Sequence, residues 1–395
     1  MSDSGSPSLR VSPRAAQTSL YVAGFIALGL VDGGVGPSLS TFAANADVSL
    51  GEIAIIVAAM ALGRLTGSAI AGRLYARAHG HRALAAGYAL TALAAAAITF
   101  VPGVPAAAAA FFLLGGFSST VDVGSNTLIQ WTHGDRVGPY MNGLHLAFGA
   151  GGALAPLLIA ASLTLSGQVR VAWLVIGAVN ALIMLAALTV SPPKPSVSAA
   201  ASAAGKRPPT ATLALVGLLF FAYAGCEATM FTWTADYGVS LGFDRTGAAT
   251  ALATAFWLSF MAGRLFAIPA THRWPIRTVS IGALGLGIIS GLAFVLSAGQ
   301  SPWVWIAVCG LGVAIGPIFP NMLAFAGERL GATAGITGFV FVLTSVGAML
   351  WPWLAGQLFE PTRGAVIPLM AFGFAAVSLL LFGLFDRATH LSRKR

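Results

Sequence analysis

The sequence of 395 residues predicts an all-α membrane protein, with twelve transmembrane helices arranged as two pseudo-symmetric six-helix bundles. Three observations predict this fold. Hydrophobic residues make up 57% of the chain and charged residues only 8%, whereas a soluble domain carries about 25% charged residues. The hydrophobic residues gather in runs of the length that crosses a bilayer, about 20 residues. A sequence repeat relates the two halves of the chain.

Twelve apolar runs follow one another along the chain. Residues 1–18 are polar and rich in Ser and Pro, which predicts a cytoplasmic tail, and residues 387–395 form a basic cytoplasmic tail. Residues 191–210, rich in Pro, Ser and Ala, predict a cytoplasmic linker between the six-helix bundles 19–190 and 211–386. The predicted spans are residues 19–42, 52–75, 83–101, 105–131, 139–165, 170–190, 211–236, 246–270, 276–298, 302–327, 331–358 and 364–386.

The basic residues predict the orientation of the spans. If the N-terminus is cytoplasmic, the outer loops hold only Arg170, Arg245 and Arg363, while the other loop and tail cations lie inside. Lys and Arg accumulate on the cytoplasmic side of membrane proteins. Both termini are therefore predicted to be cytoplasmic, and we expect the chain in a bacterial inner membrane. Because topology explains the net charge of +9, no nucleic-acid partner is expected.

An internal repeat supports the division into two halves. The motif VSLG at Val48–Gly51 recurs at Val239–Gly242, and Ala71–Arg82 recurs in similar form as Ala262–Arg273. Both matches share one offset of about 190 residues. Chance similarity between Ala- and Gly-rich helices is the alternative, but it does not predict a constant offset across a loop, a helix and a second loop.

The loop after the second span resembles the signature of the major facilitator superfamily. In that family the loop reads roughly G-x-L-x-D-R-x-G-R-R, but here Ala76 replaces the Asp and His81 replaces one Arg. The resemblance covers nearly the whole chain past the tail and implies the fold of that family, with Arg77 and Arg82 in a gating loop. The matching positions are Gly72, Leu74, Arg77, Gly80 and Arg82.

A narrower resemblance appears in three places: the fourth and fifth spans, the seventh span and the tenth span. The segments that are similar to those of the fucose and glucose symporter branch of the superfamily are Asp122–Asn126, Pro139–Gly149, Tyr223–Glu227 and Gly316–Asn321. That branch uses carboxylates in the first and fourth helices for proton-coupled sugar entry. The resemblance implies the same use for Asp32 and Asp122.

Five ionisable side chains within the predicted spans are candidates for a functional site, because each costs at least about 2.5–3.5 kcal/mol near the bilayer centre unless it faces a polar cavity or a partner. Asp32 and Arg64 lie at similar depths and could form an ion pair, either as a proton or substrate site or as a structural salt bridge. Asp122 and His145 share one level and predict a proton site. Glu227 predicts a substrate contact from the second half.

Polar amides and prolines complete the predicted site. Asn126, Asn142 and Asn321 could bind solute hydroxyls, or they could stabilise helix contacts instead. Pro317 and Pro320 are predicted to break the tenth span, as in helices that line transporter sites. The repeat-related Arg73 and Arg264 are predicted to reach the headgroups or brace gates and not to bind solute.

The sequence thus predicts a secondary active transporter and not an enzyme. We expect proton-coupled symport of a small polar solute, foremost a sugar, with Asp32, Asp122 and His145 in coupling. Solute and lipid are the expected partners of a monomer that needs no cofactor and has no metal site, with sodium as the alternative coupling ion. Three alternatives stay open: a drug/proton antiporter with an aromatic pocket near Trp257, an organic-anion transporter using Arg64, and a receptor that transports nothing.

Overall fold

The computed structural model describes residues 12–77, 80–194, 210–297, 300–330 and 334–392, and these form helices and connecting turns without a strand. The first half comprises α1 (Pro13–Ala46), α2 (Leu50–Ile53), α3 (Ile55–Ala76), α4 (Gly80–Ala97), α5 (Gly103–His133), the short turn η1 (Gly134–Arg136), α6 (Gly138–Ser166) and α7 (Arg170–Thr189). The second half comprises α8 (Thr210–Ser240), the π-helical turn η2 (Arg245–Ala249), α9 (Thr250–Arg273), α10 (Ile276–Leu296), α11 (Trp303–Ile315), α12 (Ile318–Leu330), α13 (Ala334–Phe359) and α14 (Val366–Ser392).

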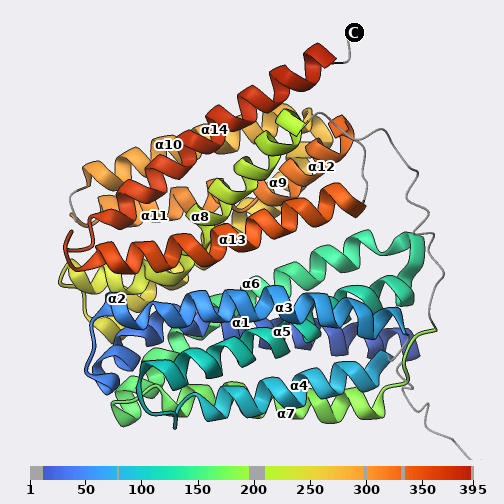
Figure 1. The fold of residues 1–395 in the computed structure, drawn as a ribbon, viewed down its shortest axis with the longest axis vertical. Coiled ribbons are helices and arrows are strands. Elements are labelled where there is room, and N and C mark those ends of the chain that lie inside the picture. Colours follow the sequence, from blue (N-terminus) through green and yellow to red (C-terminus); the bar gives the residue numbers. More distant parts are fainter. Residues whose placement is uncertain (1–11, 78–79, 195–209, 298–299, 331–333, 393–395) are drawn as a thin grey trace, which may run out of the picture.

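The helices pack as two bundles, one per half of the chain (Figure 1). In the first bundle α1 pairs with α6, α3 with α5, and α4 with α7. In the second bundle α8 pairs with α13, α9 with α11, and α10 with α14. Each pair occupies the same place in the helix order of its own half, so the sequence repeat corresponds to a structural repeat.

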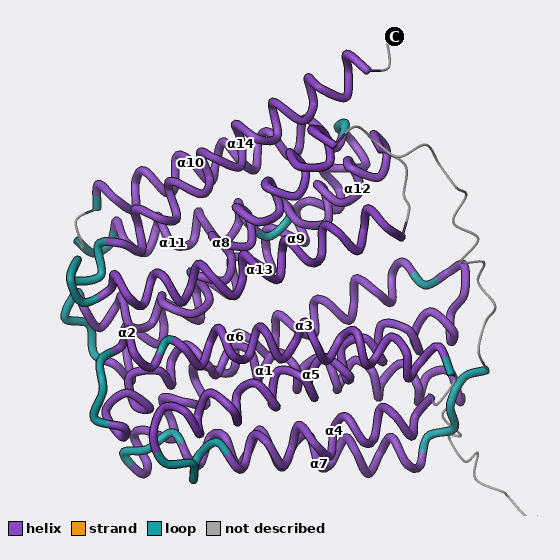
Figure 2. The backbone as a smooth tube through the Cα atoms, viewed as in Figure 1, coloured by secondary structure: helices purple, strands orange, loops and turns teal. Residues whose placement is uncertain are grey.

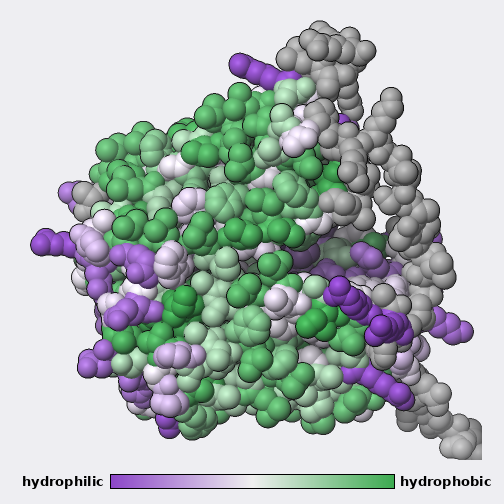
Figure 3. All heavy atoms as spheres, in the orientation of Figure 1, coloured by the Kyte–Doolittle hydropathy of each residue, from purple (hydrophilic) through white to green (hydrophobic). Residues whose placement is uncertain are grey.

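The outer surface of the molecule is suited to lipid. Within the described ranges, eleven helices are long and apolar enough to cross a membrane. Helix α4 falls short because its 18 residues include His81 and Arg82 in the first turn. Leu93, Leu165 and Leu182 are 67%, 80% and 66% exposed. Figure 3 shows hydrophobic residues over the middle of the molecule and hydrophilic residues at its two ends, where the loops of Figure 2 lie.

Helices within a bundle approach one another at backbone distance. A Cβ atom on Gly63 of α3 would lie 1.9 Å from the carbonyl oxygen of Phe112 on α5, and one on Gly115 would lie 2.1 Å from the carbonyl oxygen of Met60. Real Cβ atoms do not reach these distances, so only glycine fits there. Small residues drive such contacts in membranes, where lipid removes the hydrophobic preference for helix association.

The two bundles meet at the end of the molecule where α2 lies, here called the α2 end; the opposite end, which carries the start of α1 and the end of α14, is the terminal end (Figure 1). At the α2 end, Leu50 N–H donates to the Glu360 carboxylate at 3.0 Å. Gln357 Nε2 donates to the carbonyl oxygen of Gly51 at 2.5 Å. Towards the terminal end the space-filling view is hollowed between the bundles, with hydrophilic residues inside the hollow (Figure 3).

Two helix boundaries differ from the predicted tails. Helix α1 begins at Pro13, within the predicted tail, because Ser12 caps it by accepting from Ala15 N–H and proline is favourable in the first turn. Helix α14 continues to Ser392, past the predicted end at 386. Residues 1–11, most of the predicted linker (195–209) and 393–395 lie outside the described residues.

Candidate functional site

The first bundle contains an ion pair near the middle of helices α1 and α3. Arg64 of α3 donates from Nη2 to Oδ1 of Asp32 on α1, and the two side chains are 30% and 19% exposed. The α3–α5 contact fixes this arginine, because Ser119 Oγ of α5 donates to the Arg64 carbonyl oxygen at 2.9 Å. The ion pair predicted from the matching depths of these residues is therefore present.

A second carboxylate lies beside this pair. Asp122 of α5 accepts a hydrogen bond from Asn126 Nδ2 at 2.8 Å, as their spacing of one helical turn predicts. Asp122 interacts electrostatically with Arg64 and with Asp32. The group therefore holds two carboxyl groups and one guanidinium, and one bound proton would make it electrically neutral.

The second bundle contains a matching arginine–carboxylate pair. Glu227 of α8 accepts from the Tyr223 hydroxyl at 2.9 Å, and Arg264 Nη2 of α9 lies 3.9 Å from Glu227 Oε1. The Arg264 side chain is 27% exposed, and its guanidinium lies 4.4 Å from the centroid of the Phe260 ring.

This placement of Arg264 corrects the sequence prediction. Arg264 was expected to reach the headgroups or brace a gate, yet it turns inward because Glu227 and an unpaired backbone carbonyl, that of Gly316, attract it. Its repeat counterpart Arg73 is exposed and donates to Ala69 O of its own helix at 3.1 Å. The repeat predicts equivalent positions, but it does not predict which of the two has an acidic neighbour.

His145 does not pair with Asp122 as predicted. Its ring packs edge-on against Phe25 of α1 at 5.7 Å between centroids, and it interacts electrostatically with Arg264. Helix α6 lies between α1 and α9, so a residue on this face meets those helices and not the Asp122 face of α5. Both His145 and Asn142 are exposed.

Asn321 lies beside the break in the tenth span, where α11 ends at Ile315 and α12 begins at Ile318. The predicted break is therefore confirmed. The Asn321 side chain is 6% exposed, and its Nδ2 has no hydrogen-bond partner within the described part of the chain. An unpaired buried amide is costly, so this donor is available to a group that approaches the break.

The predicted gating arginines lie at the terminal end. Arg77 is the C-cap residue that directly follows α3, and both Arg77 and Arg82 are exposed. His81, which replaces the family arginine, is instead buried. Its Nε2 is 2.8 Å from the Tyr21 hydroxyl and its Nδ1 is 2.7 Å from the carbonyl oxygen of Val190. This histidine therefore joins the start of α4 to α1 and to the end of α7.

Among the charged groups that sequence reasoning missed is Asp236 of α8, which is the last residue of the predicted seventh span. Its side chain is 3% exposed and lies 3.7 Å from Arg245 Nη1. Arg245 also donates to Ser40 of α1, which makes a polar contact between the two bundles at the α2 end. A buried Asp followed nine positions later by one of the few outer-loop arginines was the available signal.

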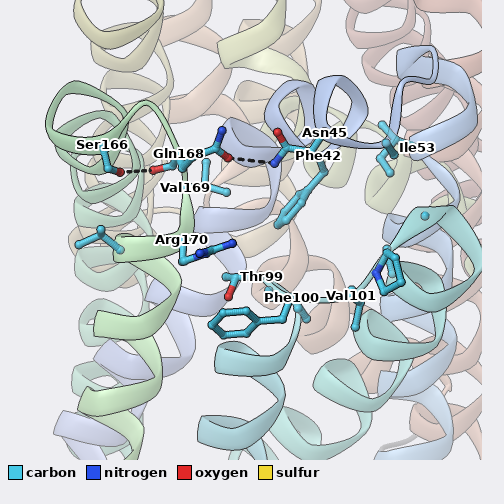
Figure 4. Close-up of a pocket in the computed structure, with 16 residues that line it drawn as sticks. Phe42, Asn45, Ile53, Thr99, Phe100, Val101, Ser166, Gln168, Val169 and Arg170 are labelled. Carbon is cyan, nitrogen blue, oxygen red and sulfur yellow. Dashed lines mark hydrogen bonds between the residues drawn. The ribbon is translucent and has the colours of Figure 1, made fainter.

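A cavity of about 680 Å³ lies at the α2 end of the first bundle (Figure 4). The Arg170 guanidinium lies 4.8 Å from the Phe100 ring centroid, and Asn45 Nδ2 donates to Gln168 Oε1 at 2.9 Å. None of the predicted site residues lines this cavity. The candidate site is therefore the two arginine–carboxylate pairs, one in each bundle. Arg264 lies towards the first bundle, because it interacts electrostatically with His145 of α6.

Comparison with known proteins identifies the family. The sequence model of the Major Facilitator Superfamily matches residues 21–352. The chain belongs to the major facilitator superfamily. As a member of this superfamily it is a multi-pass membrane transporter and not an enzyme.

Curated relatives and solved structures agree with this assignment. Sodium-dependent glucose transporter 1 of Homo sapiens is 26% identical, covering 86% of this chain and 73% of the relative. Sodium-dependent glucose transporter 1A of Mus musculus is 25% identical, covering 94% and 97%. A point variant of the nucleoside transporter NupG has a TM-score of 0.75 at 13% identity and covers 94% of this superfamily member and 99% of its own chain.

A bacterial homologue of the human lysosomal transporter Spinster, solved in an inward-facing and occupied conformation, has a similar fold. Its TM-score is 0.74 at 14% identity, and the match covers 97% of this chain and 98% of the homologue. At such identity the likeness shows the fold that the two superfamily members share.

Proposed function

We propose that this transporter is a proton-coupled symporter of a small polar solute, foremost a monosaccharide, bound between the two bundles. The observation that carries the proposal is the pair of arginine–carboxylate contacts, Asp32–Arg64 in one bundle and Glu227–Arg264 in the other. Charged groups persist within membrane spans where they face a polar cavity and serve an ion or solute pathway.

The charge balance of the first bundle favours the proton. Asp32, Asp122 and Arg64 together carry one excess negative charge when both carboxyl groups are ionised. Like charges in one site disfavour joint ionisation, so a proton on either carboxyl group relieves their repulsion. Proton binding would therefore change the attraction between α1, α3 and α5, the helices that carry the group.

The solute class is suggested by the predicted site residues and by the relatives. Asn126 and Asn142 offer amide donors and acceptors, and Glu227 offers a carboxylate, which are groups that bind sugar hydroxyls. The two mammalian relatives are named glucose transporters. Because their names also state sodium dependence, sodium is the alternative coupling ion to be tested.

In the proposed transport cycle, the two bundles rock against each other, so that the site between them is open first to one side of the membrane and then to the other. The α2 end is closed by bonds between the bundles, and the hollow lies towards the terminal end. With both termini in the cytoplasm of a bacterial cell, as the basic loops predict, this conformation would open inward. A monomer contains the whole pathway.

Uptake into proteoliposomes tests the proposal. Purified protein is given a panel of labelled monosaccharides under an imposed proton gradient, an imposed sodium gradient, or neither. We expect accumulation of a sugar with the proton gradient, loss of accumulation in Asp122→Asn, and normal accumulation in Asp244→Asn, which changes an exposed loop carboxylate. Accumulation driven only by the sodium gradient would identify sodium, and not the proton, as the coupling ion. If the Asp122→Asn protein still accumulates sugar with the proton gradient, Asp122 does not take part in coupling.

The structure favours this proposal over the transport of organic anions or drugs. Arg64 is already paired with Asp32, so an anion would have to displace a carboxylate. Of the aromatic residues expected in a drug pocket, which also include Phe339 and Phe341, Trp257, Phe256 and Phe260 are at most 2% exposed, whereas Phe341 is 48% exposed. The three buried residues pack around Phe231, which stacks on Trp257 at 3.8 Å between centroids, and thus contribute to the core.

A further inference from the structure

The break between α11 and α12 leaves a backbone carbonyl without its helical donor. In a continuous helix, the carbonyl oxygen of Gly316 would accept from the N–H of residue 320. That residue is Pro320, which has no N–H. Unpaired buried carbonyls are rare because they are costly, so the chain must supply another donor.

Arg264 supplies that donor from a different helix. Its Nε donates to the carbonyl oxygen of Gly316 at 3.1 Å. The bond forms because α9 and α11 touch at backbone distance: a Cβ atom on Gly316 would lie 2.3 Å from the carbonyl oxygen of Phe260, and one on Gly263 would lie 2.2 Å from that of Val313. The side chain of Arg264 thus links α9 to the break.

The same guanidinium keeps donors free for another group. Arginine has five N–H donors, and Nε uses one of them on Gly316. Arg264 Nη2 lies 3.9 Å from Glu227 Oε1, which is too long for a hydrogen bond. The side chain is 27% exposed and interacts electrostatically with His145 of the first bundle, so its terminal nitrogens can reach a solute between the bundles while Nε stays on the carbonyl.

We propose that Arg264 binds an oxygen acceptor of the solute through its terminal nitrogens while its Nε holds the break between α11 and α12, so that solute binding is coupled to the geometry of the broken helix. This inference rests on the proposed function, because it concerns the same hollow. The acceptor is a neutral hydroxyl or ring oxygen and not a carboxylate, because Glu227 already balances the positive charge. The unpaired side-chain amide of Asn321 lies beside the break, so a change in the geometry of the break would move this amide.

The inference is tested by Arg264→Gln, Pro320→Ala and the double variant, with Arg73→Gln as the matched control. Arg73 is the repeat counterpart of Arg264, but it donates within its own helix. Pro320→Ala gives Gly316 an intrahelical donor and so makes the Arg264 bond to the break dispensable. Two measurements are made on each purified protein: the Kd of the transported sugar, and hydrogen exchange of the backbone amides of 318–324, which needs no ligand.

We expect Arg264→Gln to raise the Kd at least tenfold and to speed amide exchange at the break at least fivefold. The double variant should regain slow exchange but not sugar affinity, whereas Pro320→Ala and Arg73→Gln should keep the Kd within twofold of the unmodified protein. Arg264→Lys keeps the positive charge but not the forked arrangement of N–H donors. If Arg264 acts only through its charge, Arg264→Lys should keep the normal Kd and slow exchange, whereas the proposed role predicts that both are lost.

Separate results overturn separate claims. An Arg264→Gln protein with unchanged exchange would overturn the link to the break, and one with an unchanged Kd would overturn the solute contact. If the unmodified protein binds no sugar of the panel, the proposed function fails, while the exchange data still decide whether Arg264 holds the break.

Discussion

The carboxylate of Glu360, just beyond α13 of the second bundle, accepts a hydrogen bond from the N–H of Leu50, the first residue of α2 in the first bundle, at 3.0 Å. The four residues of α2 therefore receive a negatively charged partner at their N-terminal end from the other half of the molecule. Beside it, Gln357 bonds to Gly51. These contacts can exist only while the α2 end is closed, so they stabilise that conformation over any in which the bundles part there.

We predict that Glu360→Ala combined with Gln357→Ala opens the α2 end more often. Both bonds are partly exposed, so their joint loss costs about 1 kcal/mol, which is roughly a fivefold change in the equilibrium. The reporter is Ala235→Cys in a chain without Cys226 and Cys309, because Ala235 is 8% exposed and borders a small void between the bundles. A membrane-impermeant thiol reagent should label it several-fold faster.

Asp244→Asn is the control for this labelling, because the Asp244 carboxylate accepts a hydrogen bond from Thr246 of its own loop. Equal labelling rates in the double variant and in the control would show that the Glu360 and Gln357 bonds do not hold the α2 end closed.

Two adjacent glycines should respond in opposite ways to alanine. A Cβ on Gly115 would lie 2.1 Å from the Met60 carbonyl oxygen, whereas the nearest atom to a Cβ on Gly116 is 3.5 Å away. Gly115→Ala must push α3 and α5 apart, at about 1–3 kcal/mol. Gly116→Ala should be neutral or stabilising by up to about 1 kcal/mol, because alanine favours helix. Thermal unfolding in detergent measures both, and similar melting temperatures would contradict this account of the α3–α5 contact.

The Asp32–Arg64 pair should show strong coupling in a double-mutant cycle. Arg64→Gln leaves Asp32 and Asp122 in the span without a cation, at about 2 kcal/mol of stability for side chains this exposed. Asp32→Asn should cost less, because Arg64 keeps Asp122 as a neighbour. The double variant removes both charges and should lose at least about 1 kcal/mol less than the sum of the single losses. Additive losses in thermal unfolding would show that the two side chains do not stabilise each other.

Asp386 should be a stability determinant of the second bundle. Its carboxylate accepts from Arg277 Nε at 2.7 Å and from Arg329 Nη2 at 2.9 Å, and it is 5% exposed. Asp386→Asn would leave two guanidinium groups beside a neutral amide, so we expect a loss of about 3 kcal/mol. The control is Asp47→Asn, an exposed residue with φ of 54°, a conformation that asparagine also adopts. If both variants melt at the same temperature, the bridge does not stabilise the bundle.

Much of the architecture could be predicted from the sequence because the bilayer restricts the choice of fold. A backbone inside lipid must satisfy its own hydrogen bonds, so each apolar run becomes a helix. The repeat around Val48 and Val239 then predicted two equivalent bundles, and the same helix pairing occurs in both. Pro317 and Pro320 predicted the break in the tenth span, because neither residue donates a backbone hydrogen bond.

The site could be predicted only in part, because the sequence does not show how each helix is rotated about its own axis relative to its neighbours. Asp32 and Arg64 were paired correctly from depth alone. The same argument failed for Asp122 and His145, because equal depth does not place two residues on facing helix surfaces. Arg264 was assigned to the headgroups because it lies near the end of its span, whereas the freed carbonyl of Gly316 and the carboxylate of Glu227 hold it inside.

The sequence by itself therefore determined the membrane environment, the number of helices and the two-fold repeat, because hydrophobicity and chain length act locally along the chain. The tertiary structure decided which charged groups share a neighbour, which end of the molecule is closed, and which residue completes the broken helix. Those outcomes depend on contacts of a few ångströms between helices that are distant in the sequence, and the rotation of each helix, set by glycine-to-backbone packing, fixes them.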